Sequence, residues 1–119
     1  MSKKILIIED EKSLGKMLAT EISATGYEVK HVESAEEAKK ASDFSADLLI
    51  IDHGLPGQQG IDAIPDFKEI FTKAKMVVFS NYNDTDHIEK AKKNGADDYW
   101  VKVNFRLDQV IEKINQILN

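Results

Sequence analysis

Ile5-Leu6-Ile7-Ile8-Glu9-Asp10 is the most informative stretch of this chain, because four apolar residues without polar alternation end at two carboxylates. Such a run is typical of a strand that is buried on both faces of a parallel sheet. Three further apolar runs stop at polar side chains: residues 48–51 at Asp52, 76–79 at Ser80 and 99–101 at Lys102. Since parallel strands end along one sheet edge, where ligands bind, we expect these side chains to converge there.

Strand and helix patterns alternate along the chain. Apolar runs predict strands at residues 5–8, 48–51, 76–79 and 98–101, and the mixed apolar and charged stretch 27–32 suits an edge strand. Helical spacing of apolar residues, with cap and stop signals, predicts helices near 14–22, 34–42, 62–72, 84–94 and 107–118. This alternation favours an α/β fold, a doubly wound five-stranded parallel sheet with five helices in three layers. Right-handed crossovers with one reversal of winding give the strand order 2-1-3-4-5, with the switch point between the first and third strands.

Two local signals predict where helices begin. Ser34 and Glu37 have the spacing of a capping box, with serine at the N-cap. Pro65 is tolerated in the first turn of a helix but costs roughly 3 kcal/mol in a helix interior. We therefore predict that the third helix begins between Asp62 and Ile64 and that residues 58–61 form a loose connection.

Length and composition exclude several classes of protein. The 119 residues suffice for one domain, so we expect a single domain over residues 1–119. A net charge of −5 argues against direct nucleic-acid binding, and the lack of cysteine excludes disulfides and thiolate metal sites. Strongly apolar runs reach only four or five residues, far short of the roughly 20 that cross a bilayer. Because no secretion signal is present either, we expect a cytoplasmic protein without membrane contact.

The residues at the predicted edge suit phosphoryl transfer assisted by a divalent metal. The carboxylates of Glu9, Asp10 and Asp52 repel one another unless a cation lies among them. Magnesium is the expected cation, because it prefers oxygen ligands and often uses one or two carboxylates plus a phosphate oxygen. An aspartate can also attack phosphorus to form an acyl phosphate, while a hydroxyl and an ammonium neutralise the phosphoryl oxygens.

With these residues in this order, the chain resembles the receiver domain of two-component response regulators, which has a flavodoxin-like architecture. The resemblance covers essentially the whole length. Its elements are the acidic pair Glu9-Asp10, the segment Asp52-His53-Gly54-Leu55-Pro56-Gly57-Gln58-Gln59-Gly60, the hydroxyl of Ser80, the segment Gly95-Ala96-Asp97-Asp98-Tyr99, and Lys102. Each element alone is weak, but together at these positions they are highly specific.

The resemblance implies a phosphoryl-accepting signalling domain of a phosphorelay. Asp52 would take the phosphoryl group from a phosphohistidine of a sensor histidine kinase or a His phosphotransfer protein. Glu9 and Asp10 would hold magnesium, with the Asp52 carboxylate and the Gly54 backbone carbonyl completing the protein ligands. Such a domain is not an enzyme acting on a separate substrate, although it catalyses its own phosphorylation and dephosphorylation with magnesium.

The resemblance also implies a switch. Lys102 and Ser80 would each bind a phosphoryl oxygen, and an inward movement of Ser80 would let the Tyr99 ring turn inward. This change would reshape the face formed by the fourth helix, fifth strand and fifth helix, which a downstream effector protein or domain would bind. A weak homodimer is compatible with the same pattern.

Two positions depart from the receiver pattern. Receiver domains usually have a proline in a cis peptide after the lysine, where this chain has Val103. Because a cis bond before a non-proline residue costs roughly 2.5 to 4 kcal/mol, we predict a trans Lys102–Val103 bond and an altered loop around Lys102. Asn81 replaces a residue that is commonly alanine or glycine. Its larger side chain is expected to narrow access to Asp52.

The three histidines have no role in this pattern. His53 follows Asp52, but side chains alternate along a strand, so we predict that His53 points away from the site. His31 and His87 have the sequence setting of ordinary surface residues.

Two other phosphate-handling functions of this architecture do not fit the sequence. A flavin phosphate would be repelled by Glu9-Asp10-Glu11, where a flavodoxin needs a hydroxyl- and glycine-rich loop. A haloacid-dehalogenase-type phosphatase needs a second aspartate two residues after the nucleophile, and Lys12 occupies that position after Asp10. A receiver-like interaction module that is never phosphorylated stays open because of Val103 and Asn81. The sequence also leaves open whether the chain is a single-domain regulator or an excised receiver.

Overall fold

A parallel sheet forms the centre of the structure, a computed structural model that describes residues 2–119. Its strands are β1 (Lys4–Ile8), β2 (Glu28–Val32), β3 (Leu48–Ile51), β4 (Lys75–Ser80) and β5 (Asp98–Val101). All neighbouring pairs are parallel, and the strand order is β2-β1-β3-β4-β5. The predicted strand order and switch point between the first and third strands are therefore confirmed.

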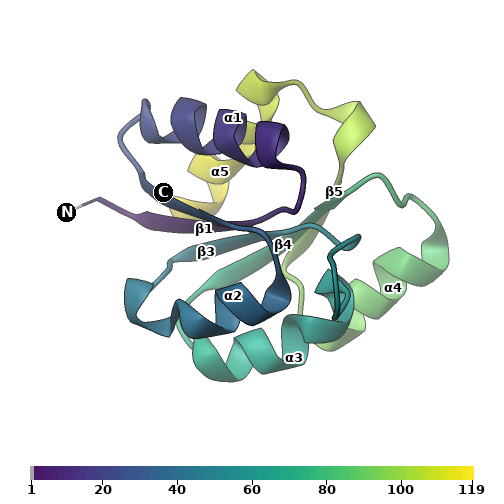
Figure 1. Cartoon of the computed structure of the whole chain (residues 1–119). Helices are drawn as coiled ribbons and strands as arrows, with labels where there is room; N and C mark the ends of the chain where they lie inside the picture. The colour runs from purple at the N-terminus through teal and green to yellow at the C-terminus, as the bar shows by residue number, and fades with distance from the viewer. Residues whose placement is uncertain (1) are drawn as a thin grey trace.

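Helices cover both faces of the sheet and complete three layers (Figure 1). They are α1 (Lys12–Ser23), α2 (Ala35–Lys40), α3 (Gly60–Ile70), α4 (Thr85–Asn94) and α5 (Leu107–Leu118), with 3-10 turns η1 (Ser42–Phe44) and η2 (Lys102–Asn104). Helices α1 and α5 pack on one face, and α2, α3 and α4 on the other. None of the helices within residues 2–119 has both the length and the apolar character that membrane crossing requires.

The apolar run of β1 is explained by burial on both faces. Leu6 and Ile8 belong to the core beneath α2 and α3, whereas Ile5 and Ile7 belong to the core beneath α1 and α5. Since successive side chains of a strand point to opposite faces, a strand between two helical layers needs apolar residues at every position. The same holds for β3, in which each residue is buried.

Helix α2 begins as predicted but ends earlier. The Ser34 hydroxyl accepts a hydrogen bond from the Glu37 amide at 3.1 Å, which is the N-cap expected from the sequence. The Glu37 carboxylate reaches back to the Glu33 amide at 3.1 Å, one residue before the expected partner. The regular helix stops at Lys40, and η1 follows it, so the predicted extent to residue 42 was too long.

The prediction for the start of α3 was wrong. The helix begins at Gly60, with Gln59 at the N-cap, and Pro65 lies inside it. Proline has no amide hydrogen, so the Ile61 carbonyl, four residues earlier, loses its usual donor. The side-chain amide of Asn94, at the end of α4, donates to that carbonyl at 2.9 Å. A residue of another helix thus replaces the hydrogen bond that the proline removes.

Asn94→Ala is expected to destabilise the fold by about 1 to 2 kcal/mol, because it leaves the carbonyl of the fully buried Ile61 without this donor. In a Pro65→Ala background the restored backbone amide can bind the same carbonyl, so Asn94→Ala should cost much less. Urea denaturation of both single variants and the double variant measures this difference. An equal loss of unfolding free energy in both backgrounds would show that Asn94 does not compensate for the proline.

Candidate functional site

Three carboxylates meet at the switch point of the sheet. Glu9 and Asp10 follow β1, and Asp52 follows β3, its neighbour in the sheet. The Asp52 amide donates to the Ile8 carbonyl at 2.9 Å, which extends the β1–β3 pairing to the edge. Oxygen atoms of Glu9, Asp10 and Asp52 lie within 4.8 Å of one another. The structure thus brings together the acidic residues that the sequence predicted to converge.

The three carboxylates differ in exposure. Glu9 is buried, with 3% of its surface exposed, whereas Asp10 is exposed and Asp52 is intermediate. Burial raises the pKa of Glu9 to about 7; the ammonium of Lys102 opposes this rise and the charge of Asp52 adds to it. Burial of the Glu9 carboxyl, more than repulsion between the carboxylates, is therefore the main cause of this shift. A second cation near Glu9 would favour its charged form further.

Lys102 supplies one positive charge to this cluster. Its Nζ lies 2.6 Å from Oε1 of Glu9 and 3.5 Å from Oδ2 of Asp52. Its ammonium also lies 5.8 Å from the centre of the Phe79 ring. The Lys102–Val103 peptide bond is trans, as predicted. It lies in η2, where 77% of the Val103 surface is exposed.

A chain of hydrogen bonds connects Ser80 to Tyr99 through the loop after β4. The buried Ser80 hydroxyl accepts from the Tyr82 amide at 3.2 Å, and the Tyr99 hydroxyl donates to the Tyr82 carbonyl at 2.6 Å. Burial raises the pKa of Tyr99, so its hydroxyl stays protonated and able to donate at neutral pH. Ser80 thus lies at the predicted sheet edge, with its hydroxyl bonded within the loop after β4.

The start of α3 is held against Asp52. A Cβ atom on Gly60 would lie 2.0 Å from the Asp52 carbonyl oxygen, so only glycine permits this approach. The Gly60 amide donates to the His53 carbonyl at 3.0 Å, and the Ile61 amide donates to His53 Nδ1 at 3.2 Å. The pKa of His53 is lowered, mainly by burial. The neutral ring is therefore favoured, and its Nδ1 can accept the hydrogen bond from the Ile61 amide.

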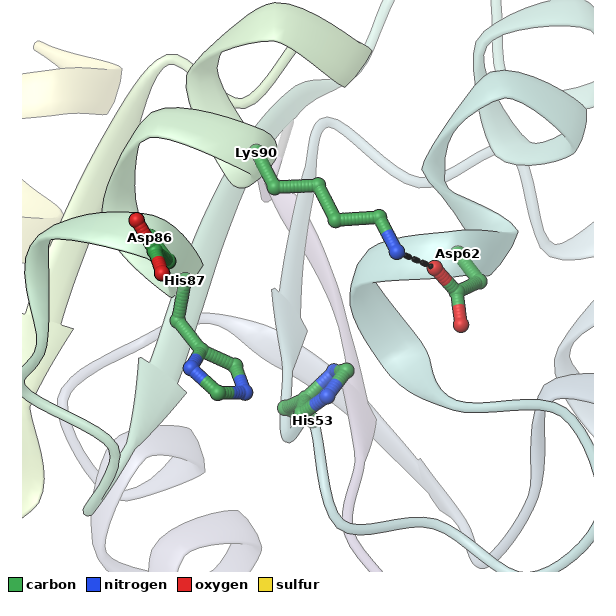
Figure 2. Close-up of a pocket in the computed structure, with 5 residues that line it drawn as sticks. All are labelled: His53, Asp62, Asp86, His87 and Lys90. Carbon is green, nitrogen blue, oxygen red and sulfur yellow. Dashed lines mark ion pairs between the residues drawn. The ribbon is translucent and has the colours of Figure 1, made fainter.

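His53 points away from the acidic cluster, as predicted. Its ring lies edge-on to those of Tyr82 and His87, with centroid distances of 5.4 and 5.0 Å. Together with Asp62, Asp86 and Lys90, the two histidines line an open pocket between α3 and α4 (Figure 2). Lys90 spans this pocket to Asp62 at 2.6 Å. The pocket therefore lies beside the candidate site, and its lysine is already paired.

The donor set fits a magnesium ion. Magnesium favours hard oxygen ligands, and one buried, one intermediate and one exposed carboxylate leave room for the waters that it retains. Gly54, whose carbonyl is the fourth predicted ligand, is exposed in the loop after Asp52. The clustered carboxylate oxygens of Glu9, Asp10 and Asp52 favour binding of a cation, and binding would compete with the proton on Glu9.

One residue near the cluster was misjudged from the sequence. His31, interpreted as an ordinary surface residue, is half-buried, and its Nε2 lies 2.7 Å from the Glu9 carbonyl oxygen. It occupies an edge strand on which exposed and half-buried residues alternate. The His31 ring lies over the buried Gly15 of α1. A glycine inside a predicted helix was the one feature of the sequence that could have indicated this close approach.

The comparison with known families and proteins agrees with this geometry. The model of the response regulator receiver domain matches residues 5–115. The chemotaxis protein CheY of Thermotoga maritima is 32% identical over 119 residues, which cover 98% of each chain. The two-component response regulator PhoP of Pseudomonas aeruginosa is 35% identical over 120 residues, covering 97% of this chain but only 51% of PhoP. The chain therefore spans CheY in full and about half of PhoP.

Solved structures support the fold. A CheY-like receiver domain protein from Methanospirillum hungatei superimposes with a TM-score of 0.91 at 22% identity, covering 98% of this chain and 93% of the other. The chemotaxis protein CheY4 of Vibrio cholerae also gives 0.91, at 21% identity, covering 99% and 100% of the two chains. At these identities the likeness establishes the architecture only.

Proposed function

Because this chain belongs to the response regulator receiver domain family, we propose that it accepts a phosphoryl group on Asp52 and thereby changes the binding of a downstream effector protein or domain. The donor is a phosphohistidine on a sensor histidine kinase or a His phosphotransfer protein in the cytoplasm. The observation that carries the proposal is the position of Asp52, which lies among Glu9 and Asp10 and within 3.5 Å of the Lys102 ammonium.

The proposed reaction is an in-line displacement at phosphorus. An Asp52 carboxylate oxygen forms a bond to phosphorus while the bond between phosphorus and the donor nitrogen breaks, and the freed imidazole keeps that electron pair. The Lys102 ammonium moves from the carboxylates to a phosphoryl oxygen, and the Ser80 hydroxyl donates to another. Glu9, Asp10, Asp52 and the Gly54 carbonyl would hold a magnesium ion, which would supply positive charge to the phosphoryl oxygens.

Intact-mass spectrometry after incubation with acetyl phosphate tests this function. We expect a mass increase of one phosphoryl group when magnesium is present and no increase when EDTA replaces it. The added group should be lost in hydroxylamine, as an acyl phosphate is. An unchanged mass with magnesium, also after incubation with a phosphorylated His phosphotransfer protein, would favour the interaction module that is never phosphorylated.

We further propose that Ser80, Tyr82 and Tyr99 link the phosphoryl group to the α4–β5–α5 face. When the Ser80 hydroxyl turns toward a phosphoryl oxygen, the Tyr82 amide loses its acceptor, and the loop that holds the Tyr99 hydroxyl can rearrange. The phosphoryl group would thereby favour one of two arrangements of this face.

Tyr99→Ala is expected to leave phosphorylation of Asp52 nearly unchanged and to remove most of the response of α4. The coupling between phosphorylation and the distant face is expected to be about 1 to 3 kcal/mol in the native protein. NMR shifts of residues 85–94 on adding beryllofluoride and magnesium measure the response. Tyr27→Ala is the control, because the Tyr27 hydroxyl donates to Asn115 of α5 near the other end of the sheet, and this variant should keep the response of α4. Shifts confined to the surroundings of Asp52 in the unsubstituted protein would contradict the switch.

A further inference from the structure

Two residues of strand β2 contact the backbone of Glu9, one at its amide and the other at its carbonyl. The Glu9 amide donates to the Val32 carbonyl at 2.9 Å, and the Glu9 carbonyl lies 2.7 Å from His31 Nε2. Because a carbonyl oxygen can only accept, the imidazole must carry its proton on Nε2. This donor fixes the plane of the peptide that joins Glu9 to Asp10.

The His31 ring packs against helix α1 at Gly15, where no side chain stands in its way. A Cβ atom on Gly15 would lie 2.1 Å from Nε2 and 2.2 Å from Cε1 of His31, so any other residue here would displace the ring. Glycine is a weak helix former, yet Gly15 lies buried inside α1, where alanine would favour the helix. The glycine thus allows the histidine to reach the Glu9 carbonyl.

We propose that His31 is a positioning residue for the magnesium site, a role that rests on the proposed function of the acidic cluster. Asp10 is exposed, so core packing does not fix the direction of its carboxylate. The Glu9–Asp10 peptide that His31 holds instead sets the position of the Asp10 backbone, from which this carboxylate reaches the metal. The Glu9 carboxylate is held separately, by Lys102 at 2.6 Å and by the Glu11 amide at 3.2 Å, so loss of the His31 donor should act mainly through Asp10.

Magnesium titration of the unphosphorylated protein, followed by NMR, tests the role of the donor. His31→Phe keeps a ring over Gly15 but removes the donor, and it should raise the magnesium dissociation constant about three- to tenfold. His31→Gln places an amide NH2 near the position of Nε2 and should restore most of the affinity. Val29→Ala truncates a half-buried residue of the same strand that packs against the core beneath α1 and α5, so it controls for general destabilisation and should bind magnesium normally.

Gly15→Ala provides an independent route to the same result. It leaves His31 in the chain but pushes its ring from the Glu9 carbonyl, so magnesium affinity should fall as in His31→Phe. In a His31→Ala background the clash is absent, and Gly15→Ala should cause no further loss. Because Gly15→Ala does not alter the histidine itself, it tests the positioning role of His31 even if His31→Phe fails to fold.

The outcomes separate this inference from the proposed function. If the unsubstituted protein binds magnesium and both His31→Phe and Gly15→Ala bind it equally well, the positioning role is overturned while the proposed function stands. A similar loss of affinity in Val29→Ala overturns it as well, because the effect then reflects stability alone. If the unsubstituted protein binds no magnesium, the proposed function fails and the positioning role fails with it.

Discussion

Asp52→Asn is expected to abolish phosphorylation by acetyl phosphate while the fold stays intact. The amide has the size of the carboxylate but lacks the negative oxygen that attacks phosphorus. Removing one charge from the cluster should also lower the repulsion that Glu9 experiences, so thermal stability without metal should not fall. Intact-mass spectrometry and circular dichroism on the same preparation measure both effects.

Asp43→Asn is the matched control, because Asp43 is an exposed aspartate of η1, away from the edge of the site. It should be phosphorylated like the unsubstituted protein. Equal labelling of Asp52→Asn and the unsubstituted protein would mean that another residue is the main acceptor.

Glu9→Gln is expected to stabilise the metal-free protein on the order of 3 kcal/mol above pH 7. The pKa of Glu9 rises from 4.5 to about 7 in the folded state, and each pH unit corresponds to about 1.36 kcal/mol. A raised pKa means that the folded state favours the protonated carboxyl. The resulting stability is present in full below about pH 4.5 and is lost as the pH rises through 7.

Urea denaturation in EDTA across this pH range measures the difference between Glu9→Gln and the unsubstituted protein. The advantage of Glu9→Gln should be largest near pH 8 and nearly vanish at pH 4.5, and magnesium should stabilise the unsubstituted protein more than the variant. Glu11→Gln, which changes an exposed neighbouring glutamate, should show no such difference. An advantage that does not vary with pH would contradict the burial of a costly charge at Glu9.

The arrangement of the sheet could be predicted from the sequence because it depends on local patterns. Apolar runs such as the one ending at Glu9 identify doubly buried strands, and the handedness of their connections leaves few strand orders. The convergence of Glu9, Asp10 and Asp52 follows from that order, since β1 and β3 are neighbours. The roles of these residues stay predictions that the proposed experiments test.

The start of α3 and the contact of His31 could not be predicted because each depends on a partner distant in the sequence. Pro65 is accommodated by Asn94, whose side chain binds a carbonyl 33 residues away. His31 binds the Glu9 carbonyl 22 residues away, in a space that Gly15 leaves open. Helix propensity and strand alternation describe neighbours along the chain, and both contacts connect different elements of the fold.

The most direct measurement is to locate the phosphoryl group after phosphorylation with magnesium and acetyl phosphate. Borohydride reduces an acyl phosphate of aspartate to homoserine, and peptide mapping by mass spectrometry then identifies the labelled position. We predict homoserine at position 52 and intact aspartate at Asp10. Homoserine at position 10 or at another aspartate, or none in a phosphorylated sample, would contradict phosphoryl transfer to Asp52.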